Sequence, residues 1–147
     1  MSCIRFNTPA QRAQMRAMAP AMLTAEEAAA LHPAPAVTES KIARLRLLAK
    51  DSNPKIRERA ALDYHLPQEV FVALAADPDD EVRACVARNE STPCDVLRSL
   101  VDDPSERVRG FLAVNFYVPA DAIELLADDP SQVVRDLVRW KSELATA

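Results

Sequence analysis

Arginines at a constant spacing have the clearest capacity for chemistry in this chain. Four of them, Arg57, Arg83, Arg109 and Arg135, follow one another at intervals of 26 residues, each directly after isoleucine or valine. A guanidinium group forms paired, planar hydrogen bonds with carboxylate or phosphate oxygens. The column therefore predicts either a set of internal ion pairs or a surface that binds an anionic ligand.

Aspartates with the same period favour the internal pairs. Asp77, Asp103 and Asp129 each precede a proline and repeat in step with the arginines. We expect each arginine to bond the aspartate of a neighbouring Asp-Pro turn. The alternative is a ladder of phosphate contacts on a nucleic acid. It requires the arginine column, together with Arg59, Arg88 and Arg107, to face solvent without carboxylate partners.

Aromatic residues occupy two equivalent loops, two periods apart: Tyr64 and His65 in one, Phe116 and Tyr117 in the other. Exposed aromatic side chains are favoured anchors for a binding partner. The alternative is that Tyr64 and Phe116, which share a column, turn inward and cover the ends of the helices. We take the exposed arrangement as the hypothesis for binding.

A second candidate surface lies near the C-terminal end. Val133 falls in a column that is otherwise charged, and Trp140 is the only tryptophan. These residues form an exposed apolar patch for a partner or a second copy, unless the tail KSELATA folds over them. The candidate binding residues are therefore Tyr64, His65, Phe116, Tyr117, Arg88 and Trp140.

Catalytic and metal-binding patterns are missing from the sequence. Gly110 is the only glycine, so no glycine-rich phosphate loop exists, and neither Ser–His–Asp nor HExxH spacing occurs. The cysteines Cys3, Cys85 and Cys94 are few and odd in number, which argues against a disulfide framework. A metal site from Cys85, Cys94 and His65 would lack closely spaced ligands. We predict a protein that is not an enzyme, with no metal and no cofactor.

Two short helices per period must position these residues. The first is expected to begin at the proline, with an acidic residue two positions later that favours the positive end of the helix dipole. It stops near the Asp-Pro pair, because proline disfavours helical geometry in the residue before it. The second helix follows at once and ends at Asn89 or Asn115, or at Asp63 in the first unit, whose side chains cap the loop backbone. The prolines are Pro67, Pro93 and Pro119, and the acidic residues are Glu69, Asp95 and Asp121.

The ends of the array are marked by charged residues in columns that are otherwise small or apolar. Arg139 continues the column Ala61, Ala87, Ala113, and Arg44 precedes the column Val70, Val96, Ala122. Terminal repeats replace stacking surfaces with polar groups. The sequence therefore predicts one half-unit and three helical hairpins, about four repeats, over residues 39–147. Residues 1–38 lie outside the register and form an N-terminal arm, with helix starts expected at Thr8 and Thr24.

Composition limits the partners. The chain has 147 residues, a formal net charge of −4 and 49% hydrophobic residues. A negative total gives no general attraction to a phosphate backbone. No apolar run approaches the length of a membrane span, and the start MSCIRFNTPAQRAQ contains no apolar signal-peptide core. We therefore expect no membrane partner and a cytoplasmic protein.

The stretch VRACVARNESTPCDVLRSLVDDPSERVR, which begins at Val82, resembles the leucine-rich repeat variant, a HEAT-like repeat. The matching features are the Val-Arg pair, the Ala-x-Asn end of one helix, the Thr-Pro start of the next, and Leu-x-x-Leu with Asp-Pro. The resemblance covers roughly residues 41–140. It implies an all-α, right-handed α-solenoid that serves as a non-catalytic protein-binding scaffold or adaptor. The nucleic-acid alternative stays open, and aromatic residues depart from the family pattern in the loops at 63–67 and 115–119.

Overall fold

Helices make up all of the regular structure in the part of the chain that the computed structural model describes, residues 30–31 and 37–146. The all-α prediction is confirmed for these residues. The chain divides into two units between Ala36 and Val37. The helix starts predicted at Thr8 and Thr24 lie outside the described residues.

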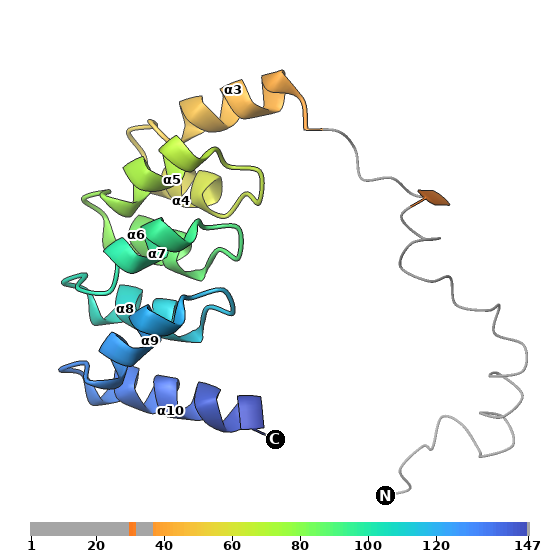
Figure 1. Ribbon diagram of the computed structural model, residues 1–147. Helices are drawn as coiled ribbons and strands as arrows, with labels where there is room; N and C mark the ends of the chain where they lie inside the picture. Colours follow the sequence, from red (N-terminus) through yellow and green to blue (C-terminus); the bar gives the residue numbers. More distant parts are fainter. Residues whose placement is uncertain (1–29, 32–36, 147) are drawn as a thin grey trace, which may run out of the picture. The chain divides into compact units, whose positions relative to one another are not determined.

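From residue 39 to residue 146, eight helices follow one another with short connections. They are α3 (Glu39–Leu48), α4 (Pro54–Ala61), α5 (Gln68–Ala75), α6 (Asp80–Arg88), α7 (Cys94–Ser99), α8 (Glu106–Val114), α9 (Ala120–Ala127) and α10 (Gln132–Thr146). In the unit that begins at Val37, α4, α6, α8 and α10 pack against one another in that order (Figure 1). The helices α5, α7 and α9 lie beside them as a second layer.

The first helix of each pair begins one residue later than the sequence suggests. Pro67, Pro93 and Pro119 are the N-cap residues, with ψ between 143° and 148°, and α5, α7 and α9 begin at the residues that follow. The fixed φ of proline suits the cap as well as the first helical position, so the ring alone does not distinguish the two. Acidic residues lie in the first turn, as predicted: Glu69, Asp95 and Asp121.

The first helices end near the Asp-Pro pairs, as predicted. They end at Ala75, Ser99 and Ala127, two to four residues before Asp77, Asp103 and Asp129. The Asp-Pro pairs therefore belong to a turn between the helices. In this turn the aspartate side chain accepts a hydrogen bond from the backbone two residues later, as Asp77 does from the Asp79 amide at 2.9 Å. Such side-chain bonds compete with helix formation.

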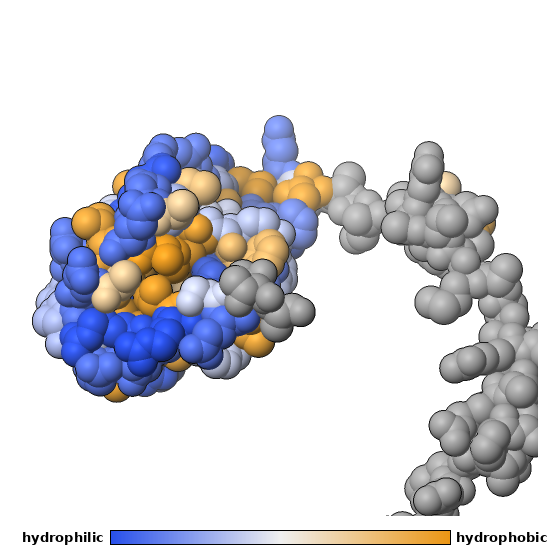
Figure 2. Space-filling view, turned by 60° about the horizontal axis from the view of Figure 1, so that its bottom comes forward, coloured by the Kyte–Doolittle hydropathy of each residue, from blue (hydrophilic) through white to orange (hydrophobic). Residues whose placement is uncertain are grey.

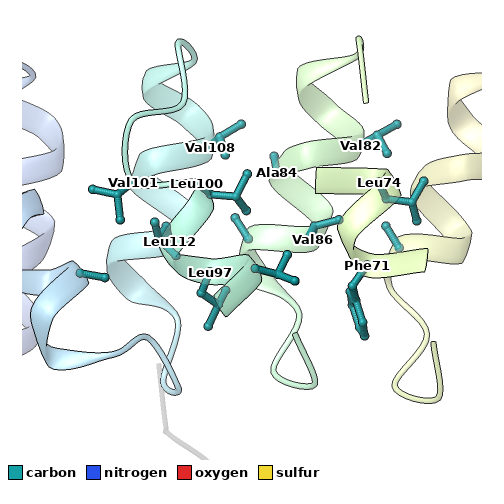
Figure 3. Close-up of a cluster of buried hydrophobic side chains, with 14 of the residues drawn as sticks. Phe71, Leu74, Val82, Ala84, Val86, Leu97, Leu100, Val101, Val108 and Leu112 are labelled. Carbon is teal, nitrogen blue, oxygen red and sulfur yellow. The ribbon is translucent and has the colours of Figure 1, made fainter. Parts of the chain in front are cut away.

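The core lies between the two layers and consists of aliphatic side chains. Leu97 and Leu100 form one buried cluster with Val86 and Leu112 of the other layer, and Phe71 extends the cluster to the neighbouring pair of helices (Figure 3). Ala61, Ala87 and Ala113 have no exposed surface, whereas Arg139, the next residue at this spacing, is exposed. Small side chains allow neighbouring backbones to approach closely. Arg44, at the other end, is also exposed.

Gly110 lies inside α8, where a methyl group is expected to stabilise the chain. A Cβ atom added there would lie 3.4 Å from Leu137 Cδ1, an ordinary contact with a flexible side chain. Alanine is favoured over glycine in a helix by about 0.5–1 kcal/mol. We expect Gly110→Ala to raise the free energy of unfolding by about 0.5–1 kcal/mol, measured by urea denaturation. A decrease in the free energy of unfolding would mean that the Leu137 side chain cannot move to make room for the added methyl group.

Candidate functional site

Three arginine–aspartate pairs connect successive turns of the described unit. The Nε atoms of Arg57, Arg83 and Arg109 donate to the carboxylates of Asp77, Asp103 and Asp129, each at 2.7 Å. Their Nη2 atoms donate to the second carboxylate oxygen at 2.8, 3.0 and 3.1 Å. Each pair is therefore bidentate, the geometry in which arginine binds a carboxylate most strongly.

The same guanidinium groups also bond the turn of their own unit. Arg83 Nη1 donates to the carbonyl oxygen of Asp77 at 2.8 Å, and Arg109 Nη1 donates to that of Asp103 at 2.6 Å. One arginine therefore joins two neighbouring turns. Arg135 follows the last turn and instead donates to the carbonyl oxygen of Asp129 and to Gln132 Oε1.

Burial makes these pairs part of the architecture. In the central pair, the side chains of Arg83 and Asp103 are 12% and 4% exposed. A buried guanidinium that already holds a carboxylate cannot bind a phosphate without losing that bond. A phosphate ladder would also need three other arginines. Arg107 pairs with Glu81 at 2.5 Å, and Arg88 lies over the Phe111 ring. Arg59 is exposed.

Acid is expected to weaken these pairs. Burial opposes ionisation of Asp77 and Asp129, but hydrogen bonds from Arg57 and Arg109 and from backbone amides outweigh it, so the pKa of each carboxyl lies below its usual value. The charged form therefore stabilises the folded chain at neutral pH. This contribution is lost as the pH falls below the ordinary aspartate pKa of about 3.9 and through the folded value.

The measurement is urea denaturation over a pH series. We expect the free energy of unfolding of the wild type to fall below about pH 4. Asp129→Asn removes one titrating carboxyl, so its free energy of unfolding should fall less steeply with acid. Equal slopes for the two chains would show that the Arg109–Asp129 pair does not contribute to acid sensitivity.

A second set of buried hydrogen bonds lies at the other ends of α4, α6 and α8. Asn89 Nδ2 donates to the carbonyl oxygens of Ala61 and Asp63 at 2.7 and 3.2 Å. Asn115 Nδ2 makes the same bonds one unit later, to Ala87 and Asn89. These asparagines cap the helices, as expected, and in addition they connect adjacent units. The sequence pattern did not show this second role.

Lys141 takes the place of asparagine in the last unit, a residue that the sequence reasoning missed. It stands 26 residues after Asn115, and its ammonium group donates to the Asn115 carbonyl oxygen. Burial lowers the pKa of Lys141 below its usual value. The signal was available, because Asp63, Asn89, Asn115 and Lys141 form one column.

The aromatic side chains of the loops are exposed, so the alternative in which Tyr64 and Phe116 turn inward and cover the helix ends is wrong. Tyr64 is 66% exposed, Phe116 77% and Tyr117 53%. The inward position is filled instead by the residues two places after Tyr64 and Phe116: Leu66 is buried and Val118 is partly buried. We call Tyr64, His65, Phe116 and Tyr117 the loop edge.

Hydrogen bonds to side chains fix the backbone of the loop edge. Asp63 Oδ1 accepts from the His65 amide, and Asn115 Oδ1 accepts from the Tyr117 amide, both at 2.8 Å. The rings of Phe116 and Tyr117 meet edge to face with centroids 5.1 Å apart. His65 is held by Lys41, whose Nζ lies 2.8 Å from its Nδ1.

The remaining candidate binding residues fall in two places. Arg88 lines a small pocket of about 210 Å³ together with Tyr64, Leu62, Asn89 and Glu90, so it lies beside the loop edge. Trp140 is on α10 and is 52% exposed. The residues after Trp140 continue α10 as far as Thr146, so they do not fold over the tryptophan.

An apolar groove lies between α8 and α10, and the sequence analysis predicted only part of its lining. Its volume is about 370 Å³, and it is lined by Glu106, Arg107, Gly110, Phe111, Val114, Val133 and Leu137. The sequence drew attention to Val133 and Trp140 but not to Phe111 and Val114. The columns that end at Leu137 and Trp140 contain Phe111 and Val114, so comparing columns between units indicates that α8 is apolar at these two positions.

The cysteines and carboxylates of the described residues show no metal-binding arrangement. Among the described residues, no three histidine, cysteine, aspartate or glutamate side chains lie close enough to hold an ion. Cys85 is partly buried, and burial raises the pKa of its thiol, while Cys94 is exposed. No described helix combines the length and apolar character needed to cross a membrane.

Comparisons with protein-family models, with curated proteins and with solved structures find no match for this chain. The functional proposal therefore rests on the geometry and chemistry of the described residues.

Proposed function

We propose that this chain is a non-catalytic protein-binding scaffold or adaptor of the leucine-rich repeat variant or HEAT-like type. In this proposal, residues 39–147 form a right-handed α-solenoid of about four helical hairpins of 26 residues. The observation that carries it is the loop edge, where Tyr64, Phe116 and Tyr117 are each more than half exposed among the described residues.

Large exposed aromatic groups favour a protein as the partner. Tyrosine and phenylalanine bring a wide apolar surface with few rotatable bonds, and tyrosine adds a hydroxyl group that tolerates water. Such residues are frequent where binding energy is concentrated. Tyr64 and Phe116 are two units apart, roughly 20 Å at ordinary helix-packing distances, so one partner could contact both.

The connections between units support a binding role for the loop edge. The arginine–aspartate pairs hold one end of the second helices, and the asparagine bonds hold the other. A partner then meets anchors whose backbone is already fixed. Less conformational entropy is lost on binding when the contact residues are ordered beforehand.

The nucleic-acid alternative draws less support from the described residues. Arg57, Arg83 and Arg109 already hold buried or partly buried carboxylates, and Arg107 holds Glu81. The net charge of −4 also opposes approach to a phosphate backbone. A salt-dependent affinity for DNA or RNA would be needed to revive this alternative.

The class of partner is tested by capture from the native cell extract. The full-length chain is used as bait in halves of one extract, with and without nuclease treatment. We expect a stoichiometric protein that is retained after nuclease treatment, because the loop edge offers apolar anchors and not free cations. Capture of material that disappears entirely with nuclease would contradict the protein-binding proposal and favour the nucleic-acid alternative.

A variant locates the contact on the loop edge. We expect the combined substitution Tyr64→Ala, Phe116→Ala and Tyr117→Ala to abolish capture while leaving the fold intact, because these side chains are exposed. The matched control is Val72→Ala with Leu125→Ala, which removes exposed apolar groups from α5 and α9. If the triple variant captured the partner as well as the control does, the loop edge would not be the binding surface.

A further inference from the structure

Helix α10 carries a second row of apolar side chains, most of which the described residues leave exposed. Val134 and Val138 are buried in the core. A different row, Val133, Leu137, Trp140 and Leu144, follows intervals of four, three and four residues. This spacing places all four on one stripe of the helix and is the spacing of helices that pair along their length. Val133, Trp140 and Leu144 are 56%, 52% and 58% exposed.

Helix α8 extends the stripe into a patch. Phe111 and Val114 line one side of the groove whose other side is formed by Val133 and Leu137. We call Phe111, Val114, Val133, Leu137, Trp140 and Leu144 the C-terminal apolar patch. Figure 2 looks onto the end of the unit formed by α10 and shows apolar side chains gathered there within a hydrophilic border.

The patch is confined to the last two helices of its layer. The column that ends at Val133 reads Lys55, Glu81, Arg107 in the earlier units. The column that ends at Trp140 reads Leu62, Arg88 and Val114 in the earlier units. The Val133 position is therefore charged in every earlier unit, and α6 carries a charge at the Trp140 position, so stacking does not require an apolar residue at either. An apolar surface outside the core is typical of an interaction site.

We propose that the C-terminal apolar patch binds the same patch of a second copy of this chain, with the two α10 helices antiparallel about a two-fold axis between Leu137 and Trp140. This arrangement brings Trp140 of one copy opposite Leu137 of the other, and Leu144 opposite Val133. Val133 and Leu137 line the groove, while Trp140 and Leu144 project beyond it. Each copy therefore supplies both a groove and the side chains that fill it, as a two-fold interface requires.

Charges at the border of the patch are paired within each copy. Asp136 and Arg139 lie on the same side of the stripe, on the next turn of α10 from one another, and form an ion pair at 3.1 Å. A second copy can therefore approach this border without meeting an unpaired charge of this pair. At the opposite border, Arg107 is already neutralised by Glu81. A border whose charges are already paired suits an apolar surface such as the same patch of a second copy better than a strongly charged partner helix.

The only tryptophan of the chain lies in the patch, so its fluorescence reports association directly. The full-length chain is diluted over a wide concentration range, and tryptophan emission is measured beside the mass in solution by light scattering. We expect a mass of twice 16.2 kDa at high concentration. The emission of Trp140 should move to shorter wavelength as the dimer forms, because its exposed half is removed from water.

Matched valine variants locate the interface. Val133 and Val72 are 56% and 55% exposed, and only Val133 belongs to the patch. We expect Val133→Gln to raise the dimer dissociation constant at least about tenfold, since the substitution occurs twice in each dimer, and Val72→Gln to leave it unchanged. Circular dichroism checks that the variants fold. If Val133→Gln does not fold, Leu144→Gln near the end of α10 takes its place.

A wild-type chain that stays at 16.2 kDa at every concentration would overturn the proposal. So would a dimer that dissociates equally in the Val133 and Val72 variants, or one whose formation leaves the Trp140 emission unchanged. The proposal does not depend on the loop edge, because the triple substitution at Tyr64, Phe116 and Tyr117 should leave the dimer intact.

Discussion

Asp103→Ala is expected to lower the free energy of unfolding by about 3–5 kcal/mol. The carboxylate of Asp103 is 4% exposed and holds two nitrogens of Arg83. Its removal leaves a guanidinium group buried beside the core without its counter-charge, and it also removes the acceptor for the Ser105 amide. Urea denaturation followed by circular dichroism measures the loss.

Asp102 provides the matched control for this substitution. It precedes Asp103 directly but is exposed. Asp102→Ala should therefore change the free energy of unfolding by less than about 0.5 kcal/mol, as is usual for exposed sites. If the two alanine variants were equally stable, the arginine–aspartate pairs would not be what joins neighbouring turns, and burial of aliphatic side chains alone would carry the architecture.

Leu112→Ala is expected to cost about 3–4 kcal/mol, because it opens a cavity where the two layers meet. Leu112 has no exposed surface and belongs to one buried cluster with Leu97 of α7 and Leu100, the residue that caps α7 (Figure 3). The control is Leu125→Ala, on a side chain that is 64% exposed and should cost little. A small effect at Leu112 would mean that α7 and α8 close the cavity by moving together.

The period of the sequence was sufficient to predict the pairs between arginine and aspartate. Arginine and aspartate repeat in step, and the distance between them in the chain, 20 residues from Arg83 to Asp103, is the same in each unit. Complementary charge at a constant separation leaves few other arrangements. Burial of Asp77, Asp103 and Asp129 then follows, because a carboxylate can leave water only with a partner.

The orientation of the aromatic side chains in the loops could not be predicted from the sequence. Tyr64 and Phe116 were open to an inward or an outward position, because an aromatic residue suits both a core and a binding surface. The side chains two places later determine the outward position of the rings, because Leu66 and Val118 fill the space that an inward ring would need. Helix starts at proline were wrong by one residue for a related reason: proline fits both the cap and the first turn.

The sequence predicted single residues of the C-terminal apolar patch but not the groove that they form with the preceding helix. Val133 and Trp140 stood out as single residues, but the groove is formed with Phe111 and Val114 of the preceding helix. A period of 26 residues aligns equivalent positions and does not show which neighbouring columns meet at a surface. That information comes from packing α10 against α8.

The central claim is that the loop edge binds a protein, and a titration of the captured partner tests it most directly. Isothermal calorimetry compares the wild type, the triple variant at Tyr64, Phe116 and Tyr117, and the control at Val72 and Leu125. The account predicts affinity at least about 30-fold weaker for the triple variant and unchanged for the control, as expected when binding energy is concentrated in a few aromatic residues. Equal affinity of all three chains would contradict it.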